Sequence, residues 1–118
     1  MRPTAENRRQ CKRHKLKNSV AVSSHGIYQV IDISRGGFRI KCPPRTPVPD
    51  FWDTDILSSA TALEGFPAKR VWVSMPENGN HQHLPTVVGV KFGRLTMKQN
   101  ALLSHFIQSI SPGGDSAQ

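Results

Sequence analysis

The stretch IYQVIDISRGGFRIKC, residues 27–42, decides how this chain folds. Residues 27–33 alternate with the period of two that is typical of a β-strand, and residues 38–42 are expected to form the next strand. Between them, the run Ser34-Arg35-Gly36-Gly37 has the residue types of a tight turn. The stretch therefore predicts a β-hairpin whose turn carries a hydroxyl group and two glycines, with an acid, Asp32, near the end of the strand before it.

Further strands are predicted on both sides of this hairpin. Residues 18–23 are β-prone, and His25-Gly26 after them predicts a turn, which extends the hairpin to a three-stranded meander. Four prolines in residues 43–49 end the regular structure, and we expect a loop there with a short helix near residues 53–59. Three more strands are expected at residues 61–64, 68–75 and 86–92. About six strands are enough to close a small barrel.

The C-terminal segment changes to a helical period. Its apolar residues fall on one helical face, and Thr96 with Gln99 three residues later fits a capping box, so a helix is predicted over residues 97–109. The sequence thus predicts a mainly β fold, a six-stranded antiparallel β-barrel with a C-terminal α-helix. Its expected parts are a flexible basic arm at 1–17, the barrel and helix at 18–111, and a disordered tail at 112–118.

The composition indicates a single domain that stays in the cytoplasm. A chain of 118 residues is about the size of one domain. Its apolar runs are too short to span a membrane, and the basic N-terminus is not followed by the apolar core of a secretory signal. Cys11 and Cys42 are expected to be reduced thiols, and a bridge between them stays open as an alternative.

The net charge of +8 is concentrated at the N-terminus. Seven of the 16 Lys and Arg residues lie within residues 1–17, where Glu6 is the only acid. Such an arm attracts phosphate groups, whether they belong to a nucleic acid, a lipid headgroup or a nucleotide ligand. Residues 6–15 contain no aliphatic side chain to anchor them, so we expect this segment to be mobile until an anionic ligand orders it.

Two short motifs narrow the choice of ligand. The first is RRQCKR at residues 8–13, and the second is DISRGG at residues 32–37, in the hairpin turn. In this order, ahead of a VGVKF strand at residues 88–92 and a helix, they resemble the PilZ family over residues 6–110. The resemblance implies a PilZ-type β-barrel from a bacterium, a receptor without enzymatic activity or cofactor. Such a receptor binds the second messenger cyclic di-GMP and regulates a downstream protein.

The resemblance assigns the arginines of the first motif to the ligand. Arg9 and Arg13 match the two arginines of the family pattern, and Arg8 matches the arginine that usually precedes them. An arginine fork can bind a phosphate through two hydrogen bonds or pair with O6 and N7 of guanine, and cyclic di-GMP offers both groups. A spacing of four brings Arg9 and Arg13 to one side only if the segment turns, so we expect a turn-like arm and not a strand.

The second motif supplies groups that the arginines lack. Asp32 can accept hydrogen bonds from N1 and N2 of guanine, and Ser34 can donate to a phosphate or within the turn. Gly36 and Gly37 are expected to provide a positive φ or the close approach of a ligand. The alternative is that the motif is only a hairpin turn, in which Asp32 and Ser34 bond to local N–H groups.

The two tryptophans receive different interpretations. Trp72 lies in a predicted strand where some PilZ domains carry an aromatic residue beside the bound guanine. Its indole either stacks on the ligand or packs in the core. Trp52 has no matching position in the family, and we interpret it as a packing residue.

Other classes of function have less support in the sequence. The cysteines and histidines lack the paired spacings of a zinc site, so no metal is expected. No nucleophile elbow or phosphate-binding glycine loop is present, so no enzyme is expected. Two alternatives stay open. One is a small nucleic-acid-binding barrel, against which the aromatic content of 7% counts, and the other is a PilZ-type adaptor that binds no nucleotide.

Overall fold

The structure is a computed structural model, and it describes residues 12–44, 46–59, 61–74 and 86–110. Within these residues the chain forms seven strands followed by one helix. The strands are β1 (His14–Lys15), β2 (Val20–Ser23), β3 (Gly26–Ile33), β4 (Gly37–Cys42), β5 (Phe51–Leu57), β6 (Ala62–Ser74) and β7 (Thr86–Phe92), and the helix is α2 (Met97–Ile110).

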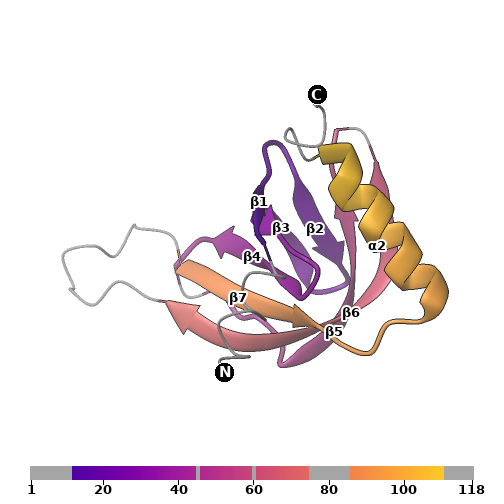
Figure 1. The fold of residues 1–118 in the computed structure, drawn as a ribbon. Coiled ribbons are helices and arrows are strands. Elements are labelled where there is room, and N and C mark those ends of the chain that lie inside the picture. The colour runs from indigo at the N-terminus through magenta and orange to yellow at the C-terminus, as the bar shows by residue number, and fades with distance from the viewer. Residues whose placement is uncertain (1–11, 45, 60, 75–85, 111–118) are drawn as a thin grey trace, which may run out of the picture.

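The strands close into an antiparallel barrel (Figure 1). Their order in the sheet is β1-β3-β2-β5-β6-β7-β4, and β4 also pairs with β3. This last pairing brings β4, at one end of the sheet, back to β3, so β2 to β7 form a closed barrel of six strands. β1 lies outside the barrel, paired with β3. The six-stranded antiparallel barrel that the sequence predicts is therefore confirmed.

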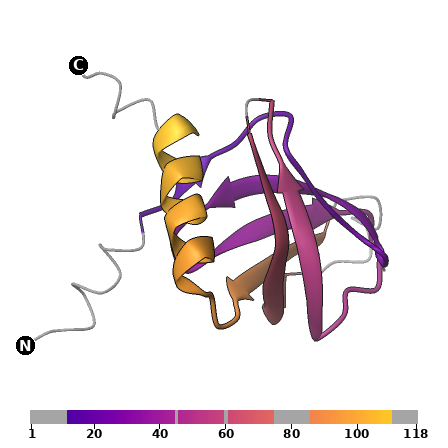
Figure 2. The same ribbon diagram turned by 90° about the vertical axis from the view of Figure 1, so that its right-hand side faces the viewer.

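Aromatic rings fill the centre of the barrel. The ring centroids of Phe38 and Phe92 lie 5.4 Å apart, and those of Phe66 and Phe92 lie 5.8 Å apart. Helix α2 lies along one side of the barrel (Figure 2), and its Leu103 and Phe106 join the same core. The predicted C-terminal helix is confirmed, and burial of its apolar face attaches it to the sheet.

The short helix expected near residues 53–59 is wrong, because β5 runs through this segment. β5 pairs with β2 on one side and with β6 on the other. Its buried residues Trp52, Thr54 and Ile56 alternate with Asp53 and Asp55, as the period of a strand requires. Aspartate is depleted in strands, so the aspartates in this segment argued against a strand although its residues alternate. Trp52 is buried, as expected for a packing residue.

The two strands expected at residues 61–64 and 68–75 are one continuous strand, β6. It passes through Gly65, which has a φ of 67°, and its register with β5 shifts close to that residue. Pro67 has no N–H to donate, but its carbonyl accepts a hydrogen bond from the N–H of Gly93 at 2.9 Å. The number of barrel strands is nevertheless six, because the missed β5 and the divided β6 offset each other.

Part of the expected arm is a strand. His14 and Lys15 form β1 opposite Ile33 and Asp32 of β3. A turn-like conformation therefore does not extend to these two residues, whereas Arg13 precedes the strand. Residues 1–11 and 111–118 lie outside the described residues, so the flexible arm and the disordered tail stay predictions.

The predicted capping box at the start of α2 is confirmed. The N–H of Gln99 donates to Oγ1 of Thr96, and the N–H of Thr96 donates to Oε1 of Gln99, both at 3.0 Å. The Gln99 side chain also donates to the carbonyl of Gly65 at 3.3 Å, which ties the start of the helix to β6. In the part of the chain that the structure describes, no helix has the length and hydropathy needed to cross a bilayer.

We expect Thr96→Ala to lower the free energy of unfolding by about 1 kcal/mol, because the N–H of Gln99 loses its acceptor. Urea denaturation followed by circular dichroism measures this change. Thr96→Ser keeps a hydroxyl oxygen at the same position and should unfold close to the parent. Equal stability of the alanine variant and the parent would contradict a role for the cap in holding α2.

Candidate functional site

One row of residues crosses the outer face of the barrel. It runs from β1 to β6 through the directly opposed residues Lys15, Asp32, Arg39, Gly89 and Trp72. Side chains that lie opposite one another in a sheet point to the same face. The row therefore sets charged groups and an indole side by side, although they come from distant parts of the sequence.

Trp72 occupies a place that a glycine leaves free. A Cβ at Gly89 would lie 2.2 Å from two atoms of the indole, so the ring covers residue 89. A register shift between Arg70 and Trp72 aligns Trp72 with Gly89. Trp72 is 41% exposed, so core packing, one of its two predicted roles, is wrong. An indole that is open to solvent can stack on a planar ring.

Asp32 is a buried carboxylate held by two arginines. Arg39 donates to Oδ2 from Nε, at 2.8 Å, and also from Nη2, while Arg13 donates from Nη1 to Oδ1 at 3.3 Å. The Asp32 side chain is only 4% exposed, against 37% for Arg39 and 50% for Arg13. A guanidinium carries five N–H donors, so each arginine keeps donors for a further partner.

Arg39 is a site residue that the sequence analysis missed. It lies outside both motifs, and the signal that could have found it is its position in the strand after the turn, where it faces Asp32 across the hairpin. Its hydrogen bonds to Asp32 raise the pKa of the guanidinium above its ordinary value, despite the opposing effect of burial. Arg39 therefore stays charged at every physiological pH.

Ser34 closes the turn between β3 and β4. Its Oγ accepts a hydrogen bond from the N–H of Gly36 at 3.2 Å and donates to the carbonyl of Gly37 at 3.4 Å. The N–H of Ser34 donates to the same carbonyl at 2.7 Å. Ser34 thus has the local role that the hairpin interpretation gives it. Asp32 departs from that interpretation, because its partners are arginine side chains.

Gly37 lies against the backbone of β7, where there is no room for a side chain. A Cβ at this position would lie 2.0 Å from the carbonyl oxygen of Val90. Of the two roles expected for Gly36 and Gly37, a positive φ is wrong, since the glycines with positive φ in the described residues are Gly26 and Gly65. The close approach of a ligand stays a prediction. The absence of a side chain at Gly37 therefore serves the contact with the backbone of β7.

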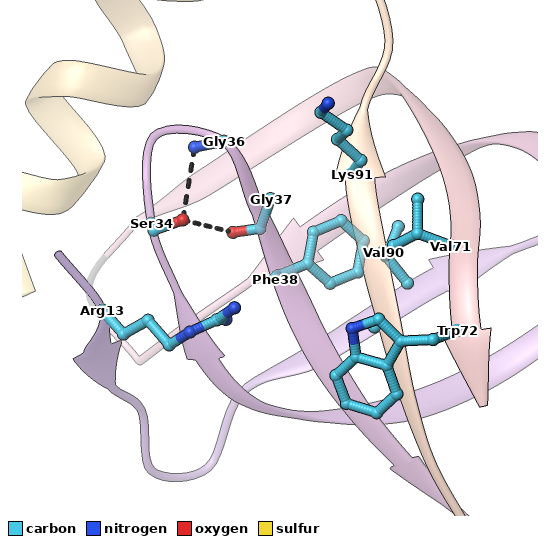
Figure 3. Close-up of a pocket in the computed structure, with 10 residues that line it drawn as sticks. Arg13, Ser34, Gly36, Gly37, Phe38, Val71, Trp72, Val90 and Lys91 are labelled. Atoms are coloured by element: carbon cyan, nitrogen blue, oxygen red, sulfur yellow. Dashed lines mark hydrogen bonds between the residues drawn. The ribbon is translucent and has the colours of Figure 1, made fainter. Parts of the chain in front are cut away.

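An open pocket of about 190 Å³ lies beside the row. Figure 3 shows Arg13 reaching toward Phe38 from one side, Trp72 lying on the other side, and Lys91 farther along β7. The lining residues come from the arm, the hairpin turn and the paired strands β6 and β7: Arg13, Ser34, Gly36, Gly37, Phe38, Val71, Trp72, Gly89, Val90 and Lys91. Two cations, an indole and accessible backbone suit an anionic ligand that has planar rings.

The structure brings together most of the predicted site residues. Arg13, Ser34, Trp72 and both turn glycines line the pocket, and Asp32 holds Arg13 at its edge. Arg8 and Arg9 lie outside the described residues, so their predicted roles stay predictions. Lys91 is a lining residue that the sequence did not reveal, because it belongs to no motif.

Volume alone does not select this site. A second hollow, of about 320 Å³, lies between the start of β2 and the end of α2. Its polar lining consists of two lysines and four serines: Lys15, Lys17, Ser19, Ser58, Ser59 and Ser109. This lining offers neither an arginine fork nor an aromatic ring, so the pocket beside Trp72 is the better candidate for a nucleotide.

The described residues assemble no metal centre. Among them, no group of three or more His, Cys, Asp or Glu side chains could hold an ion. Cys42 is a free, buried cysteine whose thiol donates to the carbonyl of Thr86 at 3.7 Å. Burial raises the pKa of this thiol, which makes it a poor nucleophile and a poor metal ligand.

Comparisons with known proteins agree with this fold. A family model described as the PilZ domain matches residues 7–109. Among solved structures, the chain is similar to the PilZ domain of YcgR from Escherichia coli with c-di-GMP. The TM-score is 0.64 at 14% sequence identity, and the match covers 87% of this chain and 91% of that one. No curated protein matches the sequence.

We expect Gly89→Ala to displace the indole of Trp72, because the new methyl group would lie 2.2 Å from the present ring position. The ring is partly exposed and can move, so the fold should survive. The Nε1–H resonance of Trp72 in an NMR spectrum should shift, while that of the buried Trp52 serves as an internal control. Two unchanged indole resonances would contradict the contact between Trp72 and residue 89.

Proposed function

The chain belongs to the PilZ family, and we propose that it is a receptor for cyclic di-GMP, which binds in the pocket between Arg13 and Trp72. The observation that carries this proposal is the row across the outer face. It sets Arg39, the buried carboxylate of Asp32 and the open indole of Trp72 side by side, and Arg13 donates to the same carboxylate from outside the row. Cyclic di-GMP has two phosphates and two guanine rings, so it can use all of these groups.

Each group of the site suits one part of the ligand. Arg13 and Lys91 offer positive charge to the phosphates, and the indole of Trp72 offers a face on which a guanine can stack. Arg39 keeps free N–H donors beside the pocket, and these suit O6 and N7 of guanine or a phosphate oxygen.

Asp32 contacts the ligand only after one arginine gives way. In the free chain both carboxylate oxygens accept hydrogen bonds from arginines. Arg13 makes the longer of these contacts and is the more exposed partner, so a phosphate draws Arg13 away more readily than Arg39. Oδ1 of Asp32 is then free to accept from the guanine edge, while Arg39 holds the carboxylate in position.

The pocket encloses only part of the ligand. Its volume of about 190 Å³ is below the roughly 300–1,000 Å³ that is usual for small-molecule sites. We propose that Arg8 and Arg9 supply the remaining contacts from the arm, which becomes ordered on the ligand. The ordered arm changes the surface beside β1, and a downstream protein responds to that change.

Single-stranded nucleic acid is the second candidate ligand. The observation in its favour is the basic outer face, where Arg13, Arg39, Lys69 and Lys91 are offset by Asp32. Salt separates the two ligands. A strand that contacts many phosphates should lose affinity steeply as salt increases, whereas a dinucleotide with two phosphates should show a shallow dependence.

We expect isothermal calorimetry to detect binding of cyclic di-GMP and to show weaker binding by Arg13→Ala. Loss of one charge-assisted contact, worth roughly 1.5–3 kcal/mol, corresponds to about tenfold or more in Kd. Lys17→Ala removes an exposed charge at the end of the arm, outside the motif, and should bind like the parent. If cyclic di-GMP gives no heat, the receptor proposal fails and an adaptor function gains support. If both variants lose affinity equally, the arm acts through diffuse charge.

We expect Arg39→Ala and Asp32→Asn each to weaken cyclic di-GMP binding several-fold. The affinity of the double variant should be close to that of whichever single variant binds less tightly. The reason is that Asp32 and Arg39 act as one bonded unit, so their effects should not add. Calorimetry of the four proteins gives this cycle. Arg35→Ala, which removes an exposed arginine from the same turn, is the matched control. Fully additive losses would show that the two residues act separately.

A further inference from the structure

The last residues of β6 form a free strand edge beside the candidate pocket. β5 accompanies β6 only as far as Lys69, which lies opposite Phe51, the first residue of β5. The N–H of Arg70 still donates to the carbonyl of Asp50, at 2.9 Å. From residue 71 to residue 74, β7 pairs with one side of β6, and no strand among the described residues pairs with the other. This end of β6 thus runs beside β7 away from β5 (Figure 1).

The edge is apolar and exposed. Val71 is 48% exposed, Trp72 41% and Val73 42%. Strand edges in natural proteins are commonly protected by charged side chains, by proline or by a covering segment, because their unpaired N–H and C=O groups attract another strand. The run Val71-Trp72-Val73 has no such protection of its own and has strong β propensity.

The charge around the edge favours a partner over self-association. Lys69 and Lys91 are exposed and directly opposed on the outer face next to it, and the nearby Asp50 is bonded to Arg70. A second copy would bring the same cations and the same net charge of +8, which opposes pairing. An acidic strand would instead meet opposite charges.

We propose that this edge, residues 71–74 of β6, is a docking site for an extended acidic segment of a partner protein, which adds to the sheet as a strand. The segment lies beside residues 71–74 of β6. Its position is in line with β5, past Asp50, where the chain leaves the sheet. Its acidic side chains face Lys69 and Lys91 on the outer face, and its apolar side chains face Val73 on the other. Such a segment alternates acidic and β-branched residues. The docking surface does not depend on the proposed ligand, but Val71 and Trp72 line the candidate pocket too.

A fluorescent octapeptide of alternating glutamate and valine tests the proposal with the full chain. We expect anisotropy to show binding, and hydrogen exchange to show protection of the amides of residues 71–74 by the peptide. The matching peptide of alternating lysine and valine should not bind. No binding of the acidic peptide, or protection elsewhere in the chain, would overturn the proposal.

A pair of lysine variants locates the peptide. Val73→Lys puts a charge on the edge and should weaken peptide binding about tenfold or more, because lysine protects strand edges. Leu102→Lys changes a residue of α2 with nearly the same exposure, 44% against 42%, and should bind the peptide like the parent. Equal binding by Val73→Lys and the parent would refute the edge as the site.

Two further measurements distinguish the docking proposal from the receptor proposal and from self-association of the chain. Val73 does not line the candidate pocket, so Val73→Lys should still bind cyclic di-GMP if the proposed function holds. Failure of the docking site is therefore distinguishable from failure of the receptor proposal. Sedimentation of the chain alone should show a monomer, and a dimer that Val73→Lys dissociates would assign the edge to a second copy and overturn the acidic partner.

Discussion

The close contact between β4 and β7 is the constraint on which the rest of the structure depends. Gly37 lies so near the Val90 carbonyl that no side chain fits between the strands. This contact joins the hairpin of β3 and β4 to the pair β6 and β7, and so closes the barrel. The row of opposed residues from Asp32 to Trp72 crosses from β4 to β7 through the same strand pairing. The fold and the candidate site therefore rest on the same backbone contact.

The buried carboxylate of Asp32 positions the arginines more than it stabilises the fold. Moving a charge out of water is costly, and a pair with partly exposed arginines returns only part of that cost. Asp32 contributes more to the positioning of the site, because its carboxylate holds Arg39 through two hydrogen bonds on a rigid strand. Arg13, held by one longer contact before β1, keeps more freedom. One arginine is thus fixed and the other is free to exchange partners.

β6 shows how one irregular strand can serve several purposes. Its first half is an ordinary barrel strand between β5 and β7, and Gly65 with Pro67 bends it without breaking it. Beyond Lys69 it loses β5 as a neighbour, and the shift after Arg70 brings Trp72 over Gly89. Register shifts of this kind commonly occur beside binding sites, because they redirect a side chain without changing the fold. The candidate pocket and the free edge both follow from this second half.

The sequence by itself determined the features that depend on neighbours in the chain. The hairpin around residues 34–37, the proline-rich break after Cys42 and the capping box of Thr96 and Gln99 follow from local turn, proline and capping chemistry. The two motifs identified Arg13, Asp32 and Ser34 as candidates through their resemblance to a family, and the same resemblance pointed to Trp72 through its position in a predicted strand. Only the tertiary structure decided that β5 is a strand, that Arg39 holds Asp32, and that Trp72 is open to solvent over Gly89. These features depend on which strands pair and in which register, and pairing between distant segments leaves little trace in local sequence.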